Sequence, residues 1–158
     1  ARAGLIGLVI AWPVVALVSQ FGSVMQQRLG GPPVPEVAHD TLAMLRDHAR
    51  EPAAWLIAIA VVTLTPLAEE LLWRGAVQQS LKRAGVPRLT AIGCSAALFA
   101  MVHWTAVPEA ARMSALPALA TLGFALGWLM ERTGRLAAPV AAHAAFNAAN
   151  LLLFSMLG

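Results

Sequence analysis

Apolar residues gather in five long runs that are separated by short polar segments. The runs cover residues 5–24, 54–76, 89–104, 110–130 and 136–157. Each run is close in length to the ~20 residues that a helix needs to cross the hydrocarbon core of a bilayer. Within a run the apolar positions are continuous, without the alternation that is typical of a transmembrane barrel strand. Because lipid offers no partner to an unpaired backbone group, each run is predicted to form a spanning helix.

The segment between the first two runs has a different pattern. It begins with the glycine- and proline-rich stretch 30–35, which predicts a loop. Residues 36–50 then place apolar side chains at helical spacing with charged side chains between them, as in an amphipathic helix on a membrane surface. We therefore expect residues 26–52 to form an extramembrane loop that carries this interfacial helix.

These elements predict an all-α fold, a polytopic transmembrane helix bundle. It has about five spanning helices and one interfacial amphipathic helix, in a single membrane-embedded domain over residues 1–158. Hydrophobic residues make up 59% of the chain and charged residues 12%, whereas an ordinary soluble domain is roughly 25% charged. So few charges could not cover the surface of a soluble particle of this size. The composition therefore excludes a cytosolic globule, a disordered chain and a nucleic-acid-binding protein, and membrane lipid is the expected partner.

The basic residues predict the orientation of the bundle. The net charge is +3, and the basic residues lie in and beside the segments between the runs. If the runs alternate across the membrane, one side receives six basic residues, namely Arg2, Lys82, Arg83, Arg88, Arg132 and Arg135. The other side receives four arginines among acidic residues, which count little in the positive-inside rule. The rule predicts a cytoplasmic N-terminus and an outside C-terminus. The alanine-, arginine- and glycine-rich composition indicates a bacterial plasma membrane.

The second run contains three charged side chains, which are costly inside a membrane and usually functional. Two of them, Glu70 and Arg74, are four residues apart, so they share a helix face and can pair. Glu69 points about 100° around the helix from Glu70 and has no cation at a suitable spacing. This carboxylate is therefore the one left for chemistry. Pro66 precedes the two acids and is predicted to kink the helix, which would let water and substrate approach.

Two further runs carry polar residues that can interact with Glu69. His103 lies in the third run, while His143 and Asn147 lie four residues apart on one face of the last run. A lone histidine on an apolar helix is more often a satisfied core residue than a catalytic one. Three runs that each carry such groups are different, because the groups can satisfy one another only by meeting inside the bundle. We therefore expect Glu69, His103 and His143 to lie close together.

This set of residues suits the hydrolysis of an amide or an ester. Glutamate can take a proton from water, and histidine can orient that water or bind a metal ion. Asparagine and a second histidine can donate hydrogen bonds to a developing oxyanion. The same Glu69, His103 and His143 could instead hold zinc with an activated water. The sequence does not contain the His-Glu-x-x-His helix of common zinc proteases. It also contains no Gly-x-Ser-x-Gly elbow, so a serine mechanism is not expected.

The ordered motifs resemble those of the CPBP family of intramembrane proteases. They read Glu69-Glu70-x-x-x-Arg74, Phe99-x-x-x-His103 and His143-x-x-x-Asn147, each on its own apolar run. The family comprises the CAAX-type prenyl endopeptidases and related bacteriocin-processing or immunity proteins, also called Abi proteins. The resemblance spans about residues 54–157, the predicted catalytic core. Members are usually longer than this chain, which implies that an N-terminal part of the native protein could be missing.

The resemblance implies roles for the polar residues. Glu69 would activate the hydrolytic water, and His103 would help to position it. His143 and Asn147 would bind the oxyanion or complete the site. The substrate would be a membrane-associated peptide or protein that the enzyme cleaves as an endopeptidase.

The resemblance also implies supporting roles for Glu70 and Arg74, which would hold the geometry of the site. It leaves the cofactor open. The family is often described as metalloproteases, with Glu69, His103 and His143 as the possible zinc ligands in this chain. A metal-free glutamate mechanism is argued for the family as well, and the sequence allows both.

The alternative to an enzyme is a membrane protein whose buried polar groups are structural or move ions. It would be a scaffold, a bacteriocin immunity protein or a transporter subunit. This alternative gains if Glu69, His103 and His143 face different surfaces of the bundle. The pair Gly123 and Gly127, four residues apart, fits close helix packing, either within the chain or between copies of it.

Overall fold

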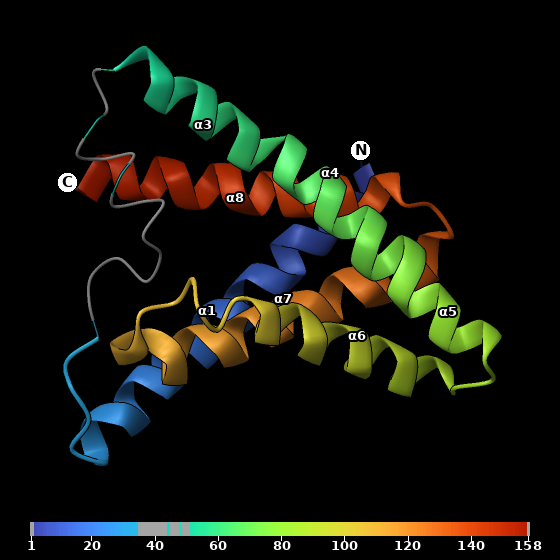
Figure 1. The fold of residues 1–158 in the computed structure, drawn as a ribbon, viewed down its shortest axis with the longest axis horizontal. Coiled ribbons are helices and arrows are strands. Elements are labelled where there is room, and N and C mark those ends of the chain that lie inside the picture. Colours follow the sequence, from blue (N-terminus) through green and yellow to red (C-terminus); the bar gives the residue numbers. More distant parts are fainter. Residues whose placement is uncertain (1, 35–43, 45–47, 49–50, 158) are drawn as a thin grey trace.

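The computed structural model describes residues 2–34, 44, 48 and 51–157 of the chain (Figure 1). All regular secondary structure in these residues is helical, which confirms the predicted all-α class. The elements are α1 (Arg2–Arg28), α3 (Pro52–Val62), α4 (Leu64–Glu70), η1 (Leu71–Val77), α5 (Gln78–Arg83), α6 (Arg88–Val102), η2 (Glu109–Ala111), α7 (Arg112–Thr133) and α8 (Ala137–Leu157). The predicted amphipathic helix lies almost wholly outside the described residues. Helix α1 continues to Arg28, so the segment predicted as a loop from residue 26 begins later than expected.

The predicted number of spanning helices is not confirmed. Among the described residues, two helices are long and apolar enough to cross a membrane, Pro52–Arg83 and Glu109–Thr133. Two shorter apolar helices, Arg88–Val102 and Ala137–Leu153, accompany them. Helix α6 falls short of a full span because it ends at Val102, so that His103 stands just beyond its last helical residue.

Helix α7 lies at the centre of the packing. It contacts α1, α6 and α8, while α8 also packs against α1, α3 and α4. Figure 1 shows α3 to α5 as one long green run, with α8 beside its first half and α6 beside its end. The turn between α5 and α6 and the turn between α7 and α8 lie at the same end of the molecule, and the C-terminus lies at the other (Figure 1). The bundle therefore places the basic residues of these two turns at one end.

The second apolar run forms a broken helix rather than a continuous one. Helix α3 ends at Val62 and α4 begins at Leu64, with Thr63 between them at φ −117° and ψ −61°. Pro66 lacks the backbone N–H that would continue the ladder here. A kink was predicted at this proline, and the structure places a break at Thr63, three residues before it. After Glu70 the helix widens into the π-helix η1 before it returns to α-helix in α5.

The two glycines of α7 are used within the chain. A Cβ atom on Gly123 would lie 3.1 Å from the Cα atom of Ala96 in α6. A Cβ atom on Gly127 would lie 2.8 Å from the side-chain oxygen of Gln78 in α5. These close approaches support intramolecular packing as the role of the glycine pair.

Candidate active site

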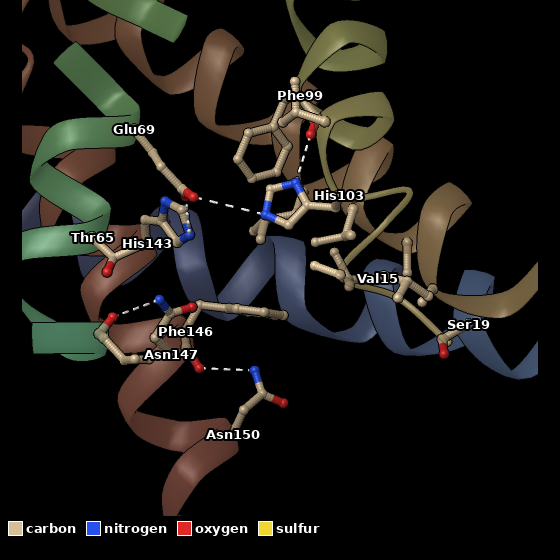
Figure 2. A pocket seen from close by; sticks show the side chains of 18 of the residues that line it. Val15, Ser19, Thr65, Glu69, Phe99, His103, His143, Phe146, Asn147 and Asn150 are labelled. Atoms are coloured by element: carbon tan, nitrogen blue, oxygen red, sulfur yellow. Dashed lines mark hydrogen bonds and ion pairs between the residues drawn. The ribbon is translucent and has the colours of Figure 1, made fainter. Parts of the chain in front are cut away.

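Glu69, His103 and His143 lie together at one point in the bundle, as predicted. Glu69 comes from the last turn of α4, His103 follows α6, and His143 comes from α8. The Nε2 atom of His103 lies 3.7 Å from one carboxylate oxygen of Glu69. The Nε2 atom of His143 lies 3.7 Å from the other oxygen (Figure 2). One carboxylate thus faces two imidazole rings, and its side chain keeps 24% of its surface exposed.

The second ring nitrogen of each histidine has an acceptor as its partner. Nδ1 of His103 lies 2.7 Å from the carbonyl oxygen of Phe99, and Nδ1 of His143 lies 2.9 Å from a carboxylate oxygen of Glu70. Because both partners can only accept, both Nδ1 atoms must donate, and this assigns the tautomers. In the neutral rings each Nε2 atom is then an acceptor that faces Glu69. The distance of 3.7 Å between each Nε2 atom and Glu69 is too long for a direct hydrogen bond. A group that donates two hydrogens, as water does, could bridge these acceptors.

Glu70 has a different environment from its neighbour. Its side chain is fully buried, and one oxygen accepts a hydrogen bond of 2.8 Å from Arg74, which confirms the predicted pair. Arg74 is also fully buried and donates its other terminal nitrogen to the carbonyl oxygen of Gly123 at 2.8 Å. The guanidinium carbon lies 5.0 Å from the ring centroid of Phe99. A buried ion pair requires such additional partners, and here the pair also carries the hydrogen bond to His143.

Gln78 continues this face of the helix, and the sequence analysis missed it. Its side chain is fully buried and donates to the carbonyl oxygen of Gly127 at 3.2 Å and to Glu131 at 2.9 Å. Lys82 holds the same carboxylate at 2.7 Å. The available signal was the spacing, since Gln78 follows Arg74 by four residues, just beyond the end of the second apolar run. A polar ladder thus runs along one helix face and contacts the backbone of α7 at two successive turns.

Asn147 lies in the same cavity as the histidines, and its described hydrogen bond is to the main chain. Its amide nitrogen donates to the carbonyl oxygen of Val61 at 2.9 Å, beside the break between α3 and α4 (Figure 2). A neighbouring helix thus satisfies a carbonyl group at a helix break, as membrane bundles require. An amide nitrogen has two hydrogens, so one is left for another acceptor. Asn150, one turn further, donates to the carbonyl oxygen of Phe146 at 2.9 Å.

The site opens into a cavity of about 670 Å³. Its polar residues include Ser19, Glu69, His103, His143, Asn147 and Asn150. The remaining wall is largely apolar and is formed with α1, α7 and α8, including Trp12, Val15, Leu119, Leu122 and Phe146. Glu69 and the two histidines are therefore polar groups in a mostly apolar cavity.

Glutamate and histidine are side chains that zinc commonly takes as ligands. In the part of the chain that the structure describes, however, no group of three or more His, Cys, Asp or Glu residues is arranged so that it could hold a metal ion. The proposed zinc ligands Glu69, His103 and His143 therefore do not fit a metal site in this arrangement.

The structure is thus a helical bundle with membrane-length apolar helices, in which one carboxylate faces two imidazole rings in a cavity. The segment 51–149 matches the family model of the type II CAAX prenyl endopeptidases, Rce1-like, and the chain belongs to this family. The match confirms the resemblance that the motifs indicated. It covers more than half of the chain and includes all the predicted site residues. The family is a membrane-embedded peptidase family. No curated protein and no solved structure matches the chain.

Proposed function

We propose that this protein is an intramembrane endopeptidase that hydrolyses peptide bonds in membrane-associated peptides or proteins. One observation carries the proposal. The carboxylate of Glu69 lies in a largely apolar cavity and faces the Nε2 atoms of two histidines, each at 3.7 Å. Membership of a CAAX-type endopeptidase family supports the same activity.

In the proposed reaction Glu69 is the general base. A water molecule donates one hydrogen to Glu69 and the other to Nε2 of His103, which its bond to the Phe99 carbonyl holds as an acceptor. Glu69 takes a proton from this water as the oxygen attacks the carbonyl carbon of the scissile bond. A carbon–oxygen bond forms, and the carbonyl oxygen becomes an oxyanion.

The oxyanion is proposed to lie against α8. Asn147 can donate its second amide hydrogen, and His143 can donate through Nε2 when it is protonated. Glu70 accepts from Nδ1 of His143 at 2.9 Å and so holds the ring with its Nε2 atom toward Glu69. When the tetrahedral intermediate collapses, the carbon–nitrogen bond breaks and Glu69 returns its proton to the leaving nitrogen. The products are a carboxylic acid and an amine.

We also propose an orientation for the bundle, in a bacterial plasma membrane. Two turns would face the cytoplasm. They are the α5–α6 turn, with Lys82, Arg83 and Arg88, and the α7–α8 turn, with Arg132 and Arg135. Single cysteines placed in the α5–α6 turn and in the α6–α7 connection test this orientation. A membrane-impermeant maleimide added to intact cells should label the second position and not the first, and the reverse pattern would overturn the orientation.

The test of the activity uses the purified protein in lipid nanodiscs and a panel of quenched fluorescent peptides. Each peptide has one apolar segment, and half of the panel ends in a prenylated cysteine motif. Wild-type protein should cleave members of the panel, and Glu69→Gln should not. Glu51→Gln is the matched control, because it makes the same change at an exposed position before α3. Equal cleavage by Glu69→Gln would refute the proposal, and no cleavage by folded wild type would favour the non-enzymatic alternative.

A further inference from the structure

A second hollow lies on another face of α7, away from the candidate site. It is a groove of about 1110 Å³ between α1, α6 and α7, and none of its lining residues lines the catalytic cavity. Small side chains form much of its floor, including Ala11, Gly93, Ala97, Ala120 and Ala125. Phe124 and Trp128 stand in its wall with 41% and 39% of their surface exposed. The groove is larger than the ~300–1,000 Å³ that is usual for a small-ligand pocket.

The cytoplasmic end of the groove, in the proposed orientation, is positively charged. Arg132 lines the groove, and Arg88 stands at the start of α6 beside it. The guanidinium carbons of Arg88 and Arg132 lie 5.7 Å and 5.8 Å from the ring centroid of Trp128. Two like charges therefore gather around one aromatic ring at the rim of an apolar groove.

Neither of these two charges forms a close ion pair within the described part of the chain, although Arg88 interacts electrostatically with Glu131 over a longer distance. The acidic residue next to Arg132 in the sequence is Glu131, and its carboxylate is bonded to Lys82 and Gln78 instead. Neither Arg88 nor Arg132 forms an ion pair with a described residue. Because the Glu131 carboxylate already pairs with Lys82, an anion from outside the chain would complete the charge balance of the rim.

We propose that this groove binds an anionic phospholipid of the bilayer. The phosphate would lie between Arg88 and Arg132, and an acyl chain would follow the apolar floor between α6 and α7. The charge of the rim complements the headgroup, and a basic cluster at a membrane surface attracts anionic lipid by ~1 kcal/mol for each charge. Trp128 occupies the position between apolar groove and charged rim that tryptophan favours at membrane interfaces. The proposal does not depend on the catalytic role of Glu69.

The chain offers a matched control for this site. Arg112 lies over Trp104 with a distance of 4.6 Å from its guanidinium carbon to the ring centroid. Neither of these residues lines the groove. The pair has the same chemistry as the rim, but it stands outside the proposed lipid site.

The experiment is native mass spectrometry of the full chain in a neutral detergent. The protein is titrated with phosphatidylglycerol and, separately, with phosphatidylcholine of identical acyl chains. We expect wild type to retain phosphatidylglycerol in preference, with about fivefold weaker binding for each of Arg88→Gln and Arg132→Gln. Arg112→Gln should bind as wild type does. Ala97→Phe should weaken retention without changing any charge, because it fills the groove.

Three outcomes would overturn the proposal. The first is a wild type that shows no preference between the two lipids. The second is an equal loss in Arg112→Gln, which would mean that surface charge alone attracts the lipid. The third is a dimer that Ala97→Phe disrupts, which would mean that a second copy of the chain covers the groove. Circular dichroism checks each variant for its helical content, and Ala97→Phe carries the test if an arginine variant does not fold.

Discussion

Glu69 and Glu70 are adjacent in the sequence but lie in opposite environments. Glu70 is fully buried, and one of its oxygens accepts hydrogen bonds from Arg74 and His143. Glu69 is partly exposed to a cavity, and its two oxygens face histidine nitrogens at 3.7 Å, beyond direct hydrogen bonding. A rotation of about 100° around one helix separates the two carboxylates. The comparison teaches that charge inside a bundle has two uses, and that the presence of close partners distinguishes a structural carboxylate from one available to react.

The largest expected effect is the loss of catalysis caused by Glu69→Gln. Cleavage should fall by about 10²–10⁴-fold, because the proposed general base is removed. The free energy of unfolding should change by less than about 0.5 kcal/mol, because the nearest histidine nitrogens lie 3.7 Å from Glu69, beyond direct hydrogen bonding. Rates of peptide cleavage and unfolding in sodium dodecyl sulfate measure the two effects. A variant that loses stability as well as activity would erase the distinction between the two glutamates.

Glu70→Gln should reduce the stability of the protein much more than Glu69→Gln does. It leaves Arg74 as a buried charge without its carboxylate, which costs about 3–5 kcal/mol of stability. The double variant Glu70→Gln with Arg74→Met should be more stable than Glu70→Gln alone, because no unpaired charge remains. Unfolding curves of the three proteins test this order. If the double variant is the least stable, Arg74 is held mainly by Gly123 and Phe99, and not by Glu70.

A smaller effect is expected from Gln78→Met, further along the same buried face. The carbonyl oxygen of Gly127 loses a donor, and we expect a loss of about 1 kcal/mol in stability. Cleavage should stay at the wild-type rate, because Gln78 does not line the catalytic cavity. Gln27→Met is the control, since Gln27 is an exposed residue of α1. A slower cleavage rate at unchanged stability would show that Gln78 helps to position the reacting groups through this polar ladder.

The smallest expected effect is that of metal removal. Dialysis against a chelator should leave cleavage unchanged, because the described residues do not form a metal-holding group. The metal content of wild type is measured beside His103→Ala and His143→Ala. Stoichiometric zinc that both variants lose, together with activity that zinc restores, would assign Glu69 to a metal site and contradict the metal-free reaction.

Simple spacing arguments predicted much of the site. The four-residue separation of Glu70 and Arg74 predicted their pair, and Pro66 predicted a break in the second run. The requirement that isolated polar groups in lipid find one another predicted the meeting of Glu69 with both histidines. Each of these predictions rests on a local rule or on the high cost of burying a polar group in lipid.

Other features depend on which helices are neighbours, and local rules do not determine this. The contact of Asn147 with the Val61 carbonyl requires α8 to lie beside the break in α3, and the contact of Gln78 requires α7 beside α5. The end of α6 before His103 was also missed, because the run has neither glycine nor proline there and Trp104 continues it beyond His103. The catalytic roles of the six predicted residues remain predictions.

Helix α8 places His143 at the reacting groups and Asn147 at the break in α3, one turn apart. An inserted or deleted residue between them would rotate one relative to the other by about 100°. It would then either turn the imidazole away from Glu69 or leave the Val61 carbonyl without its donor. Substitutions at residues 144–146 should therefore be tolerated more readily than insertions or deletions. This turn of α8 fixes the spacing between the reacting groups and the helix break that shapes the cavity.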